Sequence, residues 1–140
     1  MLLEPSTRIT LKLQEMKKYL KDLDSFITSK DQYLADTKTR RACEKTIQLS
    51  IECVIDILAI IVLKEHIGPP TDEDSFIELV RKEGIITKEL AEIVREMKGF
   101  RNIIVHKYGS LDDAKAYETI IKGRPDFETF EIQIRDYLLR

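Results

Sequence analysis

The sequence predicts an all-α protein, an up-and-down antiparallel bundle of four to five main helices in a single domain over residues 1–140. Composition is the first reason, because five glycines, four prolines and 7% aromatic residues against 34% charged residues favour helices over strands and tight turns. Periodicity is the second reason. Apolar residues recur three and four positions apart, and no segment alternates like a strand.

Each predicted helix is an apolar stripe bounded by residues that typically begin or end a helix. In chain order the segments are Ile9 to Ile27, a longer one from Asp36 or Thr37 to the stop at Gly68-Pro69-Pro70, Thr71 to Lys82, one that follows Thr87, one that follows Asp112, and a last one after Gly123-Arg124-Pro125. The second segment is apolar almost all round in its carboxyl half. This pattern predicts that it is the central helix.

Capping residues support several of these helix ends. Ser6 or Thr7 can cap the first helix, while Thr87 and Asp112 can cap the fourth and fifth. Gly84 follows the last turn of the third helix, where a left-handed residue commonly ends the element. These signals are independent of the hydrophobic pattern and agree with it.

The charge balance restricts how the protein can contact nucleic acid. A formal net charge of −2 excludes a generally basic surface that holds nucleic acid by releasing counterions. Any RNA contact must therefore be local. Two basic stretches could supply it, although a solvated helix face is the plainer interpretation of both. They are Lys12, Lys17, Lys18 and Lys21 near the start, and Arg95, Lys98, Arg101 and Lys107 later.

Cysteine placement and hydropathy indicate the compartment. Cys43 and Cys53 are ten residues apart on the long predicted helix, hence about 15 Å apart and too far for a disulfide. They are interpreted as reduced, buried thiols. No secretory leader is recognisable, so a cytoplasmic protein is expected. The apolar run 54–63 is broken by Asp56 and is shorter than the ~20 residues that span a bilayer, so no membrane segment is expected.

The stretch Phe100 to Gly109 places an arginine, an amide, a histidine and a phenol on an otherwise aliphatic helix end. Arg101 can bind a phosphate through its fork of donors, and His106 can change protonation near neutral pH. If RNA is the substrate, His106 suits the base or acid role, Arg101 would hold the non-bridging oxygens, and Asn102 would orient the imidazole. The products would be a cyclic phosphate and a free 5′-hydroxyl end. Neither a metal nor a cofactor is expected, because no ligands cluster at suitable spacing.

Helical geometry limits this site within one chain. Asn102 and His106 face the same way, and Arg101 and Tyr108 nearly share a face, but Arg101 and His106 lie about 140° apart. The helix must therefore unwind near His106, or two copies of the motif must meet across a dimer axis.

A purely structural role is an alternative, because an arginine and a histidine near the carboxyl end of a helix can satisfy carbonyl groups and the helix dipole. His66, just before Gly68, is interpreted in this way. A set of polar residues on the long helix is interpreted as a polar flank in preference to a carboxylate site. Its members are Glu44, Gln48, Glu52 and Asp56.

Residues 100–108, Phe-Arg-Asn-Ile-Ile-Val-His-Lys-Tyr, resemble the signature of the HepT branch of the HEPN superfamily. The likeness extends over most of the chain, at Gly68-Pro69-Pro70, Ser75-Phe76, Leu79, Gly84-Ile85-Ile86, Leu90, Met97-Lys98-Gly99, Asp112 and Tyr117. It implies a homodimer that cuts RNA without a metal, with Arg101 and His106 of both subunits lining one cleft. It also implies a toxin silenced by a nucleotidyltransferase, the MNT antitoxin, which transfers AMP to Tyr108.

Three hypotheses follow for the function. The first is a metal-independent endoribonuclease toxin whose partners are RNA, the antitoxin and a second copy of the chain, with no DNA or membrane partner. The second is a non-catalytic helical module that binds a nucleotide or serves as the partner subunit of a nucleotidyltransferase. The third is a structural bundle in which Arg101 and His106 only cap a helix.

Overall fold

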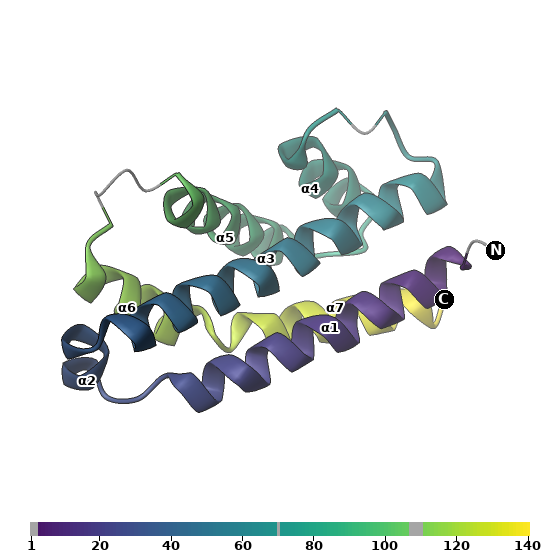
Figure 1. Ribbon diagram of the computed structural model, residues 1–140. Coiled ribbons are helices and arrows are strands. Elements are labelled where there is room, and N and C mark those ends of the chain that lie inside the picture. Colours follow the sequence, from purple (N-terminus) through teal and green to yellow (C-terminus); the bar gives the residue numbers. More distant parts are fainter. Residues whose placement is uncertain (1–2, 70, 107–110) are drawn as a thin grey trace.

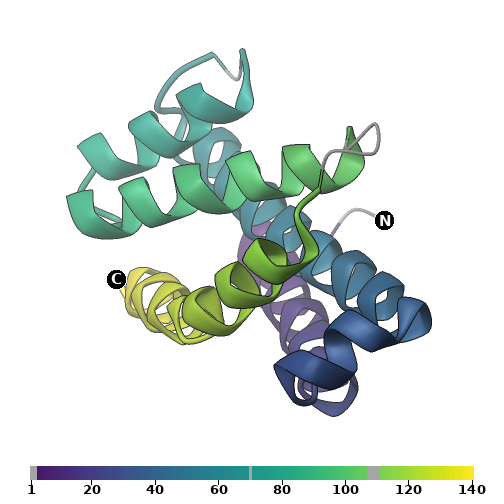
Figure 2. The ribbon, with the colours of Figure 1, turned by 90° about the vertical axis from the view of Figure 1, so that its left-hand side faces the viewer.

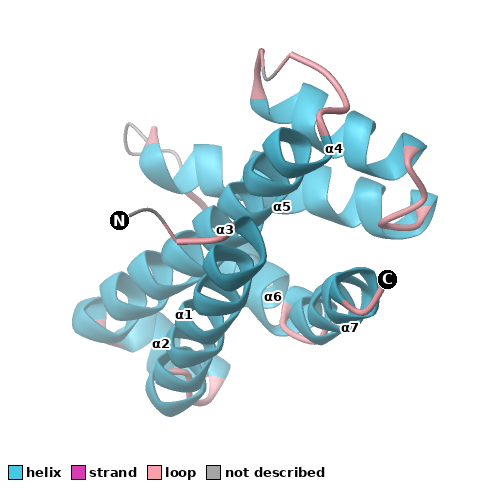
Figure 3. Ribbon diagram, turned by 90° about the vertical axis from the view of Figure 1, so that its right-hand side faces the viewer, coloured by secondary structure: helices cyan, strands magenta, loops and turns pink. Residues whose placement is uncertain are grey.

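The computed structural model describes residues 3–69, 71–106 and 111–140, and every regular element in these ranges is an α-helix (Figure 3). The helices are α1 (Pro5–Phe26), α2 (Lys30–Ala35), α3 (Thr37–Glu65), α4 (Glu73–Lys82), α5 (Lys88–Val105), α6 (Asp113–Gly123) and α7 (Asp126–Leu138). The predicted all-α bundle is confirmed. The short helix α2 is an addition that the hydrophobic pattern does not predict.

Helix α3 lies at the centre of the arrangement (Figure 1). α1 packs antiparallel along it, and the α4–α5 hairpin packs on another side of it. α7 lies beside α1, where Lys17 Nζ is 3.3 Å from Glu131 Oε2. The short helices α2 and α6 close the end of the bundle at which α3 begins. The end of α5 therefore rests on the amino-terminal half of α3.

The apolar character of α3 is explained by burial. The helix begins after Asp36, whose side chain caps it by accepting a hydrogen bond from the N–H of Lys38 at 3.0 Å. By length and composition α3 is the one helix, within the part of the chain described, that could cross a membrane. The apolar stretch within α3 is thus longer than the run 54–63, which the sequence singles out as too short to span a bilayer. Because 67% of the apolar window is buried in the bundle, packing against the other helices accounts for it.

Most of the predicted helix ends are confirmed. The side chains of Thr87 and Asp112 each accept a hydrogen bond from the N–H three residues later, both at 3.1 Å. Gly84, just past α4, has a φ of +69°, in the left-handed region that favours glycine. The hydroxyl cap predicted for the first helix is wrong. α1 begins at Pro5, because the ring of proline fixes φ near the helical value. Glu4 is the N-cap, and its side chain makes no capping bond.

Cys43 and Cys53 are free and buried, as the sequence predicts. Burial raises the pKa of the Cys43 thiol to about 11 and that of Cys53 to about 12, because a thiolate is poorly solvated in the bundle. Both thiols are therefore protonated at neutral pH.

We predict that neither cysteine reacts with iodoacetamide in the folded protein at mildly alkaline pH, since the thiolate is the nucleophile and burial suppresses it. Intact-mass spectrometry should show no adduct after an incubation that modifies both cysteines in concentrated urea. An adduct on either cysteine before unfolding would contradict the buried, protonated assignment.

Candidate active site

The carboxyl end of α5 carries three of the four predicted site residues. Arg101 and Asn102 lie in its last turns, and His106 is its C-cap, with φ −109° and ψ 26°. The N–H of His106 donates to the carbonyl oxygen of Asn102 at 2.9 Å. Because these angles depart from the helical values of about −63° and −42°, the imidazole is not held to the direction that a regular helix would give it. Tyr108, the predicted modification site, lies outside the described residues.

The guanidinium of Arg101 is held from two sides. Its Nε donates to the carboxamide oxygen of Asn102 at 2.9 Å, and its Nη2 donates to the carboxylate of Glu73. Its side chain is only 13% exposed. Two acceptors fix the plane of the guanidinium, which one acceptor would leave free to rotate. The sequence predicts that Asn102 orients the imidazole, whereas in the structure its oxygen orients the arginine.

Glu73 is a site residue that the sequence does not reveal. It is 28 positions from Arg101 and looks like any acidic residue in the first turn of a helix. Its position is set by the capping of α4. The Asp72 side chain accepts from the N–H of Ser75 at 2.8 Å, and the Ser75 hydroxyl bonds back to Asp72. In the sequence, the one indication of this contact is an acidic first turn of a helix that forms a hairpin with a following helix rich in basic residues.

The pair at Arg101 ends a series of ion pairs between α4 and α5. The two helices run antiparallel (Figure 2), so carboxylates along α4 meet cations along α5 in reverse order. The pairs are Glu73–Arg101, Asp74–Lys98 at 2.7 Å and Glu78–Arg95 at 2.9 Å. These three cations therefore form an ion-paired face between α4 and α5. It is neither the free basic patch nor the solvated helix face that the sequence offers, because the side chains of Lys98 and Arg101 are only 20% and 13% exposed.

The polar flank predicted on α3 needs one correction. Gln48 donates to Glu52 at 2.8 Å and Asp56 is exposed, as expected of a flank. Glu44, in contrast, is only 2% exposed. Its carboxylate accepts hydrogen bonds from Arg41 Nη1 at 3.0 and 3.2 Å. The helix turns this position inward, which the spacing of charged residues alone does not predict.

The second histidine of the chain has the structural role that the sequence predicts. His66 is the C-cap of α3 in the left-handed region, with φ 53° and ψ 41°, and its N–H donates to the carbonyl of Leu63 at 3.4 Å. Within the described ranges no group of three or more histidine, cysteine, aspartate or glutamate side chains could hold a metal ion.

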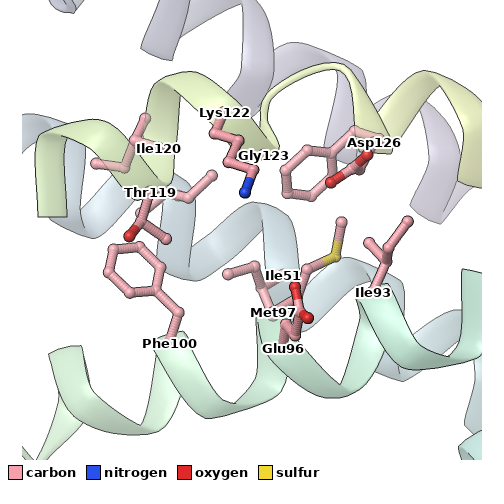
Figure 4. Close-up of a pocket in the computed structure, with 12 residues that line it drawn as sticks. Ile51, Ile93, Glu96, Met97, Phe100, Thr119, Ile120, Lys122, Gly123 and Asp126 are labelled. Carbon is pink, nitrogen blue, oxygen red and sulfur yellow. The ribbon is translucent and has the colours of Figure 1, made fainter. Parts of the chain in front are cut away.

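A cavity of about 230 Å³ lies between α5 and the turn from α6 to α7 (Figure 4). Met97 and Phe100 contribute to its apolar wall, and Glu96, Lys122 and Asp126 lie at its polar side. Burial, reinforced by the charge of Glu96, raises the pKa of Asp126. The predicted site residues do not line this cavity, and its two carboxylates disfavour a phosphate there.

Comparison with known proteins identifies the family. The ribonuclease HepT-like family model matches residues 16–134. The chain belongs to this family. A tRNA nuclease HepT of Aphanizomenon flos-aquae is 31% identical over 133 residues, which cover 94% of this chain and 90% of the relative. An mRNA nuclease HepT of Shewanella oneidensis is 28% identical over 120 residues, which cover 85% and 90%.

The fold of this HepT-like chain is also found in a solved structure. A tri-AMPylated HEPN toxin of Shewanella oneidensis, in complex with an MNT antitoxin, matches with a TM-score of 0.86 and 25% identity, over 91% of this chain and 96% of that one. The family that residues 100–108 predict is thus confirmed, together with the helical fold.

We predict that Glu73→Ala lowers the free energy of unfolding by about 1 to 3 kcal/mol, because it removes the counter-charge of a largely buried guanidinium. Urea denaturation followed by circular dichroism measures the loss. Asp74→Ala is the matched control, since Asp74 lies in the same turn and forms an ion pair but has a side chain 66% exposed, so its loss should stay below about 1 kcal/mol. Equal losses in both variants would contradict a distinct role for the pair at Arg101.

Proposed function

We propose that the protein is a metal-independent endoribonuclease that acts in the cytoplasm as the toxin of a toxin–antitoxin pair. The observation that carries the proposal is the guanidinium of Arg101, fixed by Asn102 and Glu73 five positions before His106, in a member of the HepT-like family. The nuclease names of the two HepT relatives support an activity on RNA.

Arg101 would bind the scissile phosphate through the edge of its guanidinium that these contacts leave accessible. Asn102 engages Nε and Glu73 engages Nη2, so the Nη1 edge is the one to meet a non-bridging oxygen. Because both contacts exist before RNA arrives, the donor is already oriented for the charge that develops in the transition state. The negative charge of Glu73 also offsets part of the positive charge of Arg101. This weakens the attraction of Arg101 for a phosphate.

His106 would move the protons of the reaction. It is exposed at the end of α5, and as a base it takes the proton of the ribose 2′-hydroxyl. The 2′-oxygen then attacks phosphorus, the bond to the 5′-oxygen breaks, and that oxygen accepts a proton from an imidazolium. The products are a 2′,3′-cyclic phosphate and a 5′-hydroxyl end, and no step calls for a metal.

The proposal includes a homodimer with facing sites. Ile103, which lies between Arg101 and His106 in sequence and does not line the groove beside α3, is apolar and 50% exposed. A second copy that covers it would remove apolar surface from water and bring two motifs into one cleft. The cleft could then combine an arginine of one subunit with a histidine of the other.

We further propose that an MNT-type nucleotidyltransferase is the antitoxin and that it transfers AMP to Tyr108. The AMPylated HEPN toxin in complex with an MNT antitoxin supports this partner. Tyr108 follows His106 by two positions, so an attached AMP would bring phosphate to the donors that bind RNA. The modification would silence the toxin by occupying its cleft.

We predict that the purified protein cleaves RNA in the presence of EDTA, and that Arg101→Ala and His106→Ala each reduce cleavage about 100-fold or more. Gel analysis measures the rate, and mass spectrometry of the fragments should find the cyclic phosphate. His66→Asn is the matched control and should stay active, because asparagine tolerates the left-handed backbone at that helix end. Undiminished cutting by both active-site variants would overturn the assignment, and RNA binding without cutting by the unaltered protein would favour a non-catalytic module.

A second prediction concerns the modification. Coexpression with the cognate antitoxin should raise the intact mass in steps of one AMP, and Tyr108→Phe should abolish the increase, because the phenol oxygen is the acceptor. Tyr117→Phe is the matched control, since the Tyr117 hydroxyl donates to the carbonyl of Thr28 at 3.0 Å in a structural contact. AMP on the Tyr108→Phe protein would identify a different acceptor.

A further inference from the structure

An open groove lies between α3 and the end of α5, next to the candidate active site. Its volume is about 420 Å³. It is lined by Arg41, Glu44, Lys45, Gln48, Ile104 and Val105. Because Val105 directly precedes His106, the groove reaches the residue before the predicted base. α3 supplies the polar wall and α5 supplies the apolar wall.

The charges in this groove differ from those on the α4 side of α5. There, each cation has a carboxylate of α4 as its partner. In the groove Lys45 is exposed and forms no ion pair with any residue that the structure describes. Arg41 and Lys45 together face a single lining carboxylate, that of Glu44. The groove thus carries the excess positive charge that the paired face lacks.

Glu44 gives Arg41 a defined position. The buried carboxylate accepts two hydrogen bonds from Nη1, while the arginine side chain is 58% exposed. The position of the Arg41 side chain is therefore fixed, and its remaining guanidinium N–H groups are presented toward solvent. The arrangement repeats that of Glu73 and Arg101, in which a carboxylate orients the guanidinium before any ligand binds.

The substrate chemistry calls for such a surface. The whole chain has a formal net charge of −2, so the binding of an RNA backbone must depend on a few local cations. Arg101 alone is a weak source of affinity, because it shares its charge with Glu73. A phosphate beside the scissile one needs a second cation within reach of the site.

We propose that this groove binds the RNA backbone at a phosphate adjacent to the scissile one, with Lys45 as the main contact and Arg41 beside it. The apolar wall of Ile104 and Val105 would pack against the ribose or base of that nucleotide. The inference rests on the proposed ribonuclease function, because it assigns an RNA subsite to the same active centre.

The test compares Lys45→Ala with Lys88→Ala, which removes an exposed lysine at the start of α5, the opposite end of that helix from His106. Fluorescence anisotropy with a labelled single-stranded RNA measures affinity over a range of salt concentrations, in a His106→Ala background that prevents cleavage. Lys45→Ala should weaken binding about three- to ten-fold and lower the slope of log affinity against log salt by about 0.7, the value for one phosphate contact. Lys88→Ala should change neither quantity.

Steady-state cleavage kinetics distinguish a contribution of Lys45 to RNA binding from a contribution to the chemical step. In the otherwise unaltered protein, Lys45→Ala should raise KM and leave kcat unchanged, and Lys45→Glu should raise KM further. Arg41 is not the residue to vary, because its loss would leave the buried Glu44 carboxylate without this donor. Thermal unfolding should be the same for all the lysine variants, since both side chains are exposed.

Several results would overturn the groove assignment. One is an unchanged salt slope and KM in Lys45→Ala. Another is an altered oligomeric state of that variant by light scattering, which would assign the groove to a contact between copies of the chain. Failure of the proposed function has a different signature, namely no cleavage by the unaltered protein while RNA binding still depends on Lys45.

Discussion

The arrangement depends on covering α3. This helix is apolar nearly all round in its carboxyl half, so other helices must pack on it from several directions. α5 is one of them, and its buried stripe of Leu90, Val94, Met97 and Ile104 sets its rotation about its own axis. That rotation turns Arg101 toward α4 and leaves Val105 beside α3. The hydrophobic core thus decides which polar neighbours the motif meets.

Electrostatics acts within the geometry that the core imposes. Because α4 and α5 are antiparallel, the acidic start of one lies opposite the basic end of the other. The arginine gains a fixed orientation from this pairing, but it loses part of its attraction for phosphate. Orientation and attraction are therefore supplied by different residues, with Glu73 and Asn102 providing the first and the cations of α3 available for the second.

Local features of the fold could be predicted from the sequence, and contacts between distant segments could not. Periodicity and the caps at Thr87 and Asp112 report on neighbours within a few residues, so they identified the helices and their ends. The helix α2 is only six residues long, too short to show a period. The motif itself identified Arg101 and His106 as candidate site residues. Glu73 and the buried Glu44 were missed, because the packing of different helices determines which carboxylate meets which guanidinium.

The capping box of α4 has a consequence for how this protein can change over generations. Asp72 and Ser75 hold the first turn in which Glu73 sits, and Glu73 in turn orients the arginine. A substitution at either capping position would fray that turn without touching RNA, the arginine or the histidine. Under the proposed function, toxicity can therefore be attenuated by degrees through a helix end remote in sequence from the motif. If the chain is the proposed toxin, a lineage under pressure from it has this route to a milder variant whose motif is unchanged.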